Sequence, residues 1–252
     1  MKFIIASLPR SGSTAVYRVI QSGTTARVAY EPTFFDDRED ISQIKKTTSK
    51  YSRRFDGIKH VWDPNGWPFR NRHHVSTLSA LMNSDELILP NKTVLECADR
   101  IVLLRRRNAF DRTLSDLWGQ QTGLWGHDPR QPYADSEVHQ YRAAALRHVP
   151  APIDPEVFGW YMHNAERWEK AIIDGLSPST VKILFFEDLF GSDVEGDQSL
   201  SHWRHLTEWL DMELDFHSPL VRQIISPKSK LNSVDIYKRI PNFEYLNAVF
   251  CK

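Results

Sequence analysis

Short apolar runs that alternate with helical segments are the feature that most limits how this sequence can fold. Five runs have the length and composition of short strands, the first and last being of the fully buried type: 3–7 (FIIAS), 27–31 (RVAYE), 57–62 (GIKHVW), 100–105 (RIVLLR) and 181–186 (VKILFF). Apolar residues spaced by three and four predict helices over 14–22, 108–122, 155–174 and 199–210. Strands that alternate with helices form a parallel sheet covered on both faces. The sequence therefore predicts an α/β fold.

The positions of glycine and proline residues, and the lengths of the segments, predict where the helices end and how the elements are connected. Gly23 stands where a C′ glycine would end the first helix, and Trp118 lies on the apolar face of the helix over 108–122. Residues 123–154 contain several prolines and few apolar residues, so we predict a long excursion or lid over a site. Residues 191–201 are expected to form a surface loop. The 252 residues are expected to form one domain, 1–252.

The amino-acid composition limits the classes of molecule that the protein is expected to bind. There are 32 Lys and Arg residues against 32 Asp and Glu residues, and this zero net charge argues against a nucleic-acid coat or a general polyanion binder. The two cysteines, Cys97 and Cys251, cannot supply a four-cysteine metal site and fit a reducing compartment. No apolar stretch approaches 18 residues, so no membrane span is predicted. The expectation is a cytoplasmic protein, and no ligand pattern suggests a metal.

The loop after the first strand has the composition of an anion site. It reads Leu8-Pro9-Arg10-Ser11-Gly12-Ser13-Thr14 and leads directly into a helix. Backbone N–H groups at a helix N-terminus bind anions, Gly12 permits close approach, and Arg10 adds a cation. The loop is not a Walker A motif, because no Lys precedes Ser13. The alternative is an ordinary strand-to-helix turn with a serine as N-cap.

A second basic element follows the run over 100–105. Arg105, Arg106 and Arg107 stand at the carboxyl end of a parallel strand, where open α/β sheets bind ligands, and Arg matches phosphate geometry. Arg112 either holds the same anion or pairs with Asp116 on the helix surface. The alternative for each arginine is a solvated basic patch.

Together these elements resemble sulfotransferases that use 3′-phosphoadenosine 5′-phosphosulfate (PAPS). Residues 9–14 fit the P-[RK]-[ST]-G-[ST]-[ST] loop of that superfamily, and Arg107 with Ser115 fits its R-x7-S element. The stretch 105–126 (RRRNAFDRTLSDLWGQQTGLWG), with Gln121-Thr122-Gly123 and Trp125 in register, looks like the bacterial trehalose/glycolipid branch, as does Phe186-Glu187-Asp188-Leu189. The resemblance covers roughly residues 1–210.

The resemblance implies a P-loop-NTPase-like three-layer fold and a sulfuryl transfer from PAPS to a hydroxyl of a carbohydrate or small metabolite, without a metal. It implies that Pro9, Arg10, Ser11, Gly12, Ser13 and Thr14 hold the 5′-phosphosulfate, and that Arg107 and Ser115 hold the 3′-phosphate. It also suggests a homodimer and a C-terminal segment, 226–252, that closes over the nucleotide. The basic residues of that segment are Lys228, Lys230, Lys238 and Arg239. A solvated tail is the alternative.

Two residues compete for the role of general base. Glu31, at the end of a strand, matches the position of a catalytic glutamate in carbohydrate-type sulfotransferases, and a carboxylate near the sulfuryl group could accept the proton of the acceptor hydroxyl. His60 matches a histidine that cytosolic sulfotransferases use shortly after a lysine. The structural alternatives are a strand-end surface carboxylate for Glu31 and a hydrogen-bonded core histidine for His60.

Two other functions fit parts of the pattern. An ATP-dependent small-molecule kinase would share the mononucleotide-binding fold, although the sequence lacks both the Walker A lysine and a strand-end aspartate of Walker B type. A non-catalytic nucleotide-binding or saccharide-binding module could retain the anion-binding loop without catalysing sulfuryl transfer. Trp62, Trp67, Trp118 and Trp125 would form a saccharide platform, or else pack in the core or at its rim.

Overall fold

The computed structural model describes residues 1–32, 41–62, 88–124, 135–190, 197–226 and 234–251. In these ranges five parallel strands form one sheet in the order β2-β3-β1-β4-β5. The strands are β1 (Phe3–Ser7), β2 (Val28–Tyr30), β3 (Gly57–Val61), β4 (Arg100–Arg105) and β5 (Val181–Phe185). Phe3 lies in register with Gly57 on one side and Arg100 on the other, which makes β1 the central strand. The predicted α/β class is confirmed.

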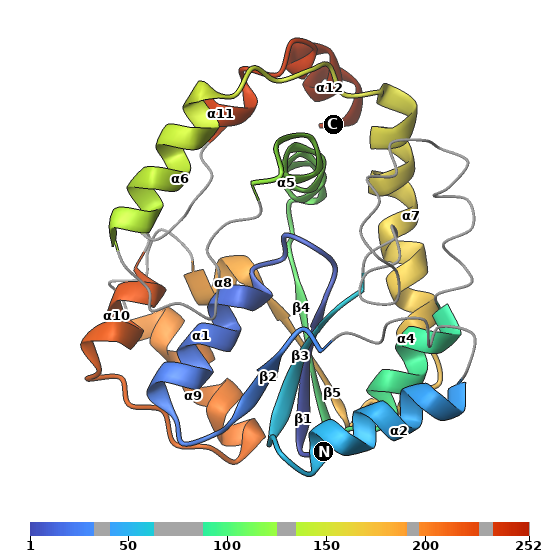
Figure 1. Cartoon of the computed structure of the whole chain (residues 1–252), viewed down its shortest axis with the longest axis vertical. Coiled ribbons are helices and arrows are strands. Elements are labelled where there is room, and N and C mark those ends of the chain that lie inside the picture. The colour runs from blue at the N-terminus through green and yellow to red at the C-terminus, as the bar shows by residue number, and fades with distance from the viewer. Residues whose placement is uncertain (33–40, 63–87, 125–134, 191–196, 227–233, 252) are drawn as a thin grey trace.

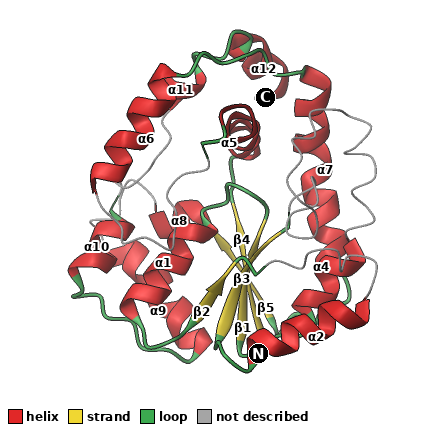
Figure 2. Cartoon of the chain, viewed as in Figure 1, coloured by secondary structure: helices red, strands yellow, loops and turns green. Residues whose placement is uncertain are grey.

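Helices cover both faces of the sheet (Figures 1 and 2). One face carries α1 (Ser13–Gly23), α8 (Phe186–Phe190), α9 (Asp197–Leu210) and α10 (Pro219–Ile225), which pack in one core with Phe3 and Ile5. The opposite face carries α2 (Ile41–Ser52), α4 (Ile88–Leu95) and the C-terminal part of α7 (Pro155–Ile173), which pack with Ile4 and Ala6. The β1 residues divide in this way because successive side chains of a strand point to opposite faces.

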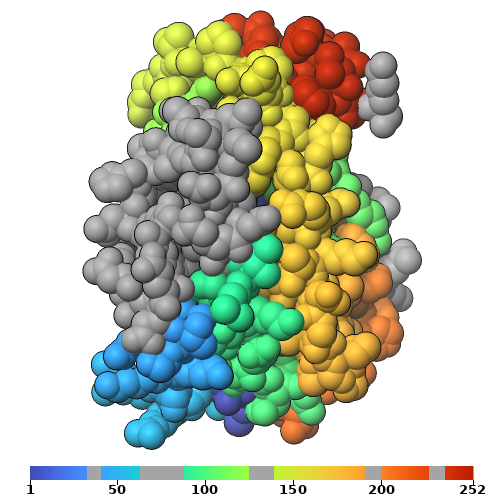
Figure 3. All heavy atoms as spheres, turned by 90° about the vertical axis from the view of Figure 1, so that its right-hand side faces the viewer, coloured from blue at the N-terminus to red at the C-terminus, as the bar shows by residue number. Residues whose placement is uncertain are grey.

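A helical layer lies beyond the carboxyl ends of the strands, at the top of Figure 1. It consists of α5 (Ala109–Thr122), α6 (Asp135–Arg147), the N-terminal part of α7, α11 (Val234–Tyr237) and α12 (Phe243–Phe250). Its core includes Trp118 and Phe158, both fully buried. The expectation that Trp118 is a core residue is confirmed. Viewed from the side of α7, the helix runs from this layer down to α4 and α2 (Figure 3).

Three expectations need correction. Strand β5 is not fully buried: it pairs only with β4 at the edge of the described sheet, and Ile183 is 42% exposed. Gly23 is the last residue of α1 and not a left-handed C′ residue; a Cβ there would lie 2.3 Å from Leu214 Cδ1, so a side chain at this position would require Leu214 to move. The loop predicted to extend to residue 201 ends earlier, because α9 begins at Asp197.

The predicted excursion over 123–154 contains a helix. Residues 125–134 lie outside the described part, but α6 spans Asp135–Arg147 and buries Tyr141 and Ala145 in the core of the helical layer. The few apolar residues of this segment are therefore sufficient to anchor it, which proline content alone did not indicate. None of the described helices is both long enough and apolar enough to cross a membrane.

Candidate functional site

The loop between β1 and α1 lies at the center of the sheet's carboxyl edge. Gly12 is the N-cap of α1, with φ 88° and ψ 9°, and it forms no side-chain capping bond. Ser13 is already helical, and its hydroxyl accepts a 2.8 Å hydrogen bond from Ser7 Oγ. The alternative of a conventional serine N-cap is therefore not adopted. The first N–H groups of a helix lack intrahelical acceptors, so this end of α1 suits an anion.

Gly12 is required for space as well as for its backbone angle. A Cβ at this position would lie 2.2 Å from Cδ2 of Phe186, the first residue of α8. The Phe186 ring in turn lies 5.4 Å from the guanidinium carbon of Arg106. The loop after β1, the loop after β4 and the start of α8 therefore meet at one point, which no spacing in the sequence specifies.

Arg10 joins the two sequence elements that were predicted to bind one ligand. Its Nε donates a 2.8 Å hydrogen bond to the hydroxyl of Ser115 on α5. Arg10 has φ 62°, a left-handed angle that is uncommon for a residue with a side chain. Such strain persists where surrounding structure enforces it, and it is frequent at functional sites. Glu31 is a second residue of this kind, with φ 38°.

Arg105, Arg106 and Arg107 each face a carboxylate. Arg105 Nε lies 2.6 Å from Glu169 of α7, and Arg106 Nε lies 3.8 Å from Glu187 of α8. Arg107 forms a bidentate pair with Asp188, at 2.7 and 2.9 Å. This hydrogen bonding raises the pKa of Arg107. The segment is therefore not the uncompensated basic patch that its sequence suggests.

The R-x7-S element is divided by the fold. Ser115 is buried and contacts Arg10, whereas the half-exposed Arg107 is held by Asp188 and lies over the Phe185 ring at 4.4 Å. The backbone N–H of Arg107 also donates to Glu187, at 3.1 Å. The structure thus brings Arg10 and Ser115 together and pairs Arg107 with a carboxylate instead.

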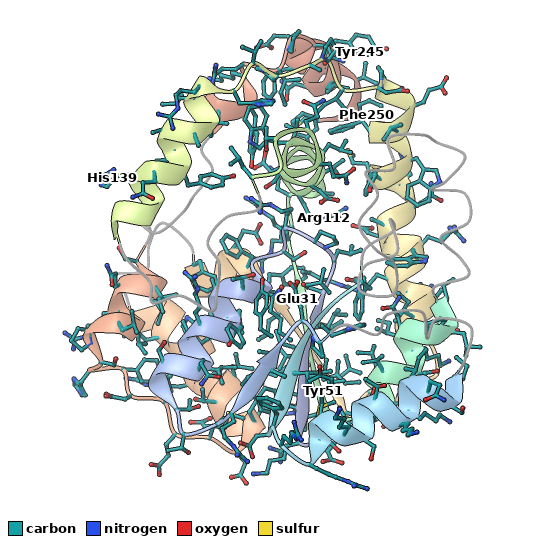
Figure 4. The ribbon with its side chains drawn as sticks, in the orientation of Figure 1. Glu31, Tyr51, Arg112, His139, Tyr245 and Phe250 are labelled. Atoms are coloured by element: carbon teal, nitrogen blue, oxygen red, sulfur yellow. The ribbon has the colours of Figure 1, made fainter. Side chains whose placement is uncertain are left out.

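Arg112, labelled in Figure 4, and Asp116 are both buried on α5. Burial lowers the pKa of Arg112, and Asp116 is the strongest of the carboxylates that oppose this shift. Of the two roles considered for Arg112, the structure favours an electrostatic interaction with Asp116, inside the protein and without a hydrogen bond between the two side chains. Burial likewise raises the pKa of Glu169 on the facing helix, against the effect of Arg105.

Glu31 lies at the carboxyl end of β2, close to the loop (Figure 4). Its carboxylate pairs with the ammonium of Lys59, which is only 1% exposed. That ammonium also lies 4.4 Å from the center of the Tyr30 ring, and the Tyr30 hydroxyl is 3.4 Å from Thr14 Oγ1. Glu31 is connected to the loop through these contacts. Sequence reasoning did not assign Lys59, whose one signal was its place beside His60.

His60 points to the other face of the sheet. It is fully buried, and its Nε2 lies 2.8 Å from Asn91 Oδ1 on α4. Burial lowers its pKa from 6.5 to about 4. Of the two interpretations, the structure favours the hydrogen-bonded core histidine.

Other predicted residues lie elsewhere or outside the described residues. Trp62 is fully buried against the sheet, whereas Trp67, Trp125, Lys228 and Lys230 fall outside the described part. Arg239 donates to the carbonyl oxygens of Ala145 and His148, at 2.9 and 3.0 Å, and so fixes the end of α6. The described end of the C-terminal segment, 234–251, is consequently packed in the helical layer and is not a solvated tail. Among described residues, no group of three metal-ligating side chains is present.

Comparison with known proteins gives little further information. No protein-family model matches the sequence, and no curated protein matches it. Among solved structures, the chain is similar to the crystal structure of a sulfotransferase from Alicyclobacillus acidocaldarius. The two share 14% identity with a TM-score of 0.42, over 100% of this chain and 96% of that chain. A similarity at this level does not establish a family.

Proposed function

We propose that the protein is a sulfotransferase that moves a sulfuryl group from PAPS to a hydroxyl of a carbohydrate or small metabolite. The observation that carries the proposal is the hydrogen bond between Arg10 and Ser115, which lie 105 positions apart in sequence. Arg10 belongs to the loop over 9–14 and Ser115 to the R-x7-S element. The two elements can bind one PAPS molecule only if the fold brings them together. The α/β sheet does so at its carboxyl edge, where such folds bind ligands.

Residues 9–14 would hold the phosphosulfate through the N–H groups at the start of α1. Arg10 would stabilise the negative charge that develops on the departing phosphate, and fixed donors of this kind are worth about 10²–10³ in rate. Ser115 would contact the 3′-phosphate, while Arg107 could do so only after release from Asp188. The residues at hand fit an anionic nucleotide, because loop amides, hydroxyls and a guanidinium converge there.

Glu31 is the base in this proposal. The acceptor oxygen attacks sulfur, the bond between sulfur and the bridging oxygen breaks with its electron pair going to adenosine 3′,5′-bisphosphate, and the hydroxyl proton passes to the Glu31 carboxylate. The Lys59 ammonium pairs with this carboxylate. Lys59 would therefore orient Glu31.

Ligand protection tests the proposed donor. Adenosine 3′,5′-bisphosphate should raise the melting temperature far more than ATP with Mg²⁺, because ligand binding to the folded state stabilises it. A larger effect of ATP would favour the kinase. Incubation with labelled PAPS and fractionated extract, followed by mass detection, should then reveal a sulfated saccharide or glycosylated metabolite. If the nucleotide binds but no acceptor is ever labelled, the non-catalytic module gains support.

Substitution of the base tests the catalytic assignment. Glu31→Gln should lower kcat by about 10²-fold with nearly unchanged affinity for the bisphosphate. His60→Gln is the matched variant, and its specific activity per folded molecule should stay within a few fold of wild type. The reverse pattern would move the role of base to His60. The proposed homodimer is tested separately, by sedimentation equilibrium of the full chain.

A further inference from the structure

Helix α2 and the turn after it carry a concentrated positive charge. Between residues 41 and 55 the sequence has no acidic residue and five cationic side chains, all exposed, which we call the α2 cations: Lys45, Lys46, Lys50, Arg53 and Arg54. The acidic residues that precede the helix, within 36–40, fall outside the described part. Cations in the last turn of a helix stabilise it through the helix dipole, but Lys45 and Lys46 lie in the first half of α2. The dipole therefore does not account for the whole group.

The apolar face of α2 is already used by the core. Ile44 and Thr48 are fully buried, and Ile44 packs in the same core as Ile4. Lys46 and Lys50 lie one turn apart on the opposite side of the helix, because 3.6 residues complete a turn. Figures 1 and 3 show α2 at the outer edge of the molecule, at the end remote from the helical layer. A partner of α2 would consequently meet its charged face.

The α2 cations are not compensated by carboxylates of the described residues. Ion pairs between described residues are formed by other cations, namely Lys2, Lys59, Arg105, Arg106 and Arg107. The arginines at the end of β4 are thus neutralised one by one, whereas the α2 cations face only one another and solvent. Like charges one turn apart repel, and this repulsion destabilises the helix. An anionic partner would remove the repulsion.

We propose that the α2 cations form a docking surface for an anionic lipid membrane. Clusters of about four to eight Lys and Arg residues on one helix bind acidic phospholipid headgroups, and each cation contributes about 5-fold to the affinity. Lysine is a point charge on a flexible stem, which suits a fluid array of headgroups that has no fixed geometry. A flat membrane also needs no recess in the protein, and α2 presents an exposed edge.

Docking through α2 would hold the molecule in one orientation. The whole chain has zero net charge, so a negative surface does not attract its other faces as a group. Arg54 is followed closely by Gly57, the first residue of β3, so the cations lie near the amino ends of the strands. The candidate site lies at their carboxyl ends and would stay accessible. The docking surface is therefore independent of the proposed sulfuryl transfer.

Sedimentation with vesicles tests the proposal on the full chain. Vesicles of phosphatidylcholine with about 30% phosphatidylserine should bind the protein, and vesicles of phosphatidylcholine alone should not. The contact is electrostatic, so it should be lost at about 1 M NaCl, where the screening length falls to about 3 Å. Equal binding to the two compositions, or binding that persists in this salt, would overturn the proposal.

A triple variant locates the contact on α2. Lys46→Gln, Lys50→Gln and Arg53→Gln together should weaken binding by about 100-fold, which is three factors of about 5. The matched control makes the same change in net charge at exposed cations of α6, α7 and α9, with the substitutions Arg147→Gln, Lys170→Gln and Arg204→Gln. This control should bind almost as tightly as the wild type. Equal losses in the two triple variants would show that net charge, and not α2, governs the contact.

Two further measurements separate charge from folding and from other polyanions. The double variant Lys46→Arg with Lys50→Arg keeps the charge and should bind the vesicles as the wild type does; a loss of binding there contradicts an electrostatic surface. Polyglutamate and double-stranded DNA should bind more weakly than the vesicles at the same salt concentration. Tighter binding of either polymer would assign the α2 cations to an acidic protein or to a nucleic acid and overturn the membrane assignment.

Discussion

The sheet with its flanking helices and the helical layer above it are held together by different means. The strands are joined by continuous parallel pairing, and their apolar runs fill a core on each face. The helical layer packs side chains from α5, α6, α7, α11 and α12 without such ladders, and single polar side chains join its segments. Asn242, for example, bonds both the N–H and the carbonyl oxygen of Ile153, at 3.0 and 2.7 Å.

This difference bears on function because the candidate site lies where the two regions meet. Arg10 comes from the loop after the central strand, whereas Ser115 comes from α5 of the helical layer. The sheet thus presents the candidate loop, and the helical layer supplies a group that contacts it.

The largest effect is expected from removing a buried tryptophan in each region. Trp168 packs on the sheet and Trp118 in the helical layer, both fully buried, and either change to alanine should cost about 3–5 kcal/mol of unfolding free energy. Amide hydrogen exchange should distinguish the two variants. We expect Trp118→Ala to speed exchange in α11 and α12 well before global unfolding, because no backbone ladder secures those helices. Equal acceleration throughout the chain would show that both regions unfold as one.

Removing one of the two buried charges of α5 should be nearly as costly. Asp116→Ala leaves the buried Arg112 without its strongest neighbouring carboxylate, and the unfolding free energy should fall by about 3 kcal/mol or more in urea titrations. The double variant Arg112→Met with Asp116→Leu should recover most of this loss, since neither of these two charges remains buried. If the double variant is as unstable as the single one, packing and not charge accounts for the effect.

The buried histidine of the sheet region should make stability depend on pH. The pKa of His60 is about 4 in the folded protein and 6.5 when unperturbed, so protonation below pH 6.5 favours the unfolded state. The neutral, buried imidazole contributes fully to the free energy of unfolding above pH 6.5. About 3 kcal/mol of that free energy should be lost as the pH falls toward 4. His60→Gln should flatten this part of the stability curve. His163→Gln, at an exposed histidine, should leave the slope unchanged.

The smallest effect compares two glycines with left-handed angles. Gly123 ends α5 at φ 67°, with nothing within 4 Å of an added Cβ, so Gly123→Ala should cost about 1 kcal/mol through backbone strain alone. Gly12→Ala adds the clash with Phe186 and should cost about 2 kcal/mol more. Combining it with Phe186→Leu should relieve part of that excess. Equal melting temperatures for the two single variants would show that the Phe186 ring moves aside freely.

Local patterns in the sequence were sufficient for most of the sheet region. All five strands coincide with predicted runs, and α1, α5, α7 and α9 begin and end within a few residues of their predicted bounds. These elements could be predicted because burial imposes a period that a short window of sequence displays. The short helices α8, α10, α11 and α12 were not predicted, since a helix of one or two turns has too few residues to display its period.

The candidate site was predicted only in part. Local sequence indicated the candidate anion loop, the arginine segment and Ser115, but not that Asp188 would hold Arg107. Partners such as Glu169, Glu187 and Asp188 are distant in sequence from the arginines they neutralise. Charge complementarity across such distances leaves no local spacing to detect.

The sequence by itself predicted the α/β class, because residues close along the chain display the burial periods of its strands and helices, and it indicated the loop after β1 as a candidate anion site. The tertiary structure alone decided which charges remain available to a ligand. Asp188 pairs with Arg107, and burial lowers the pKa of His60. Each of these effects arises from desolvation and contact between distant segments, which exist only once the chain has folded.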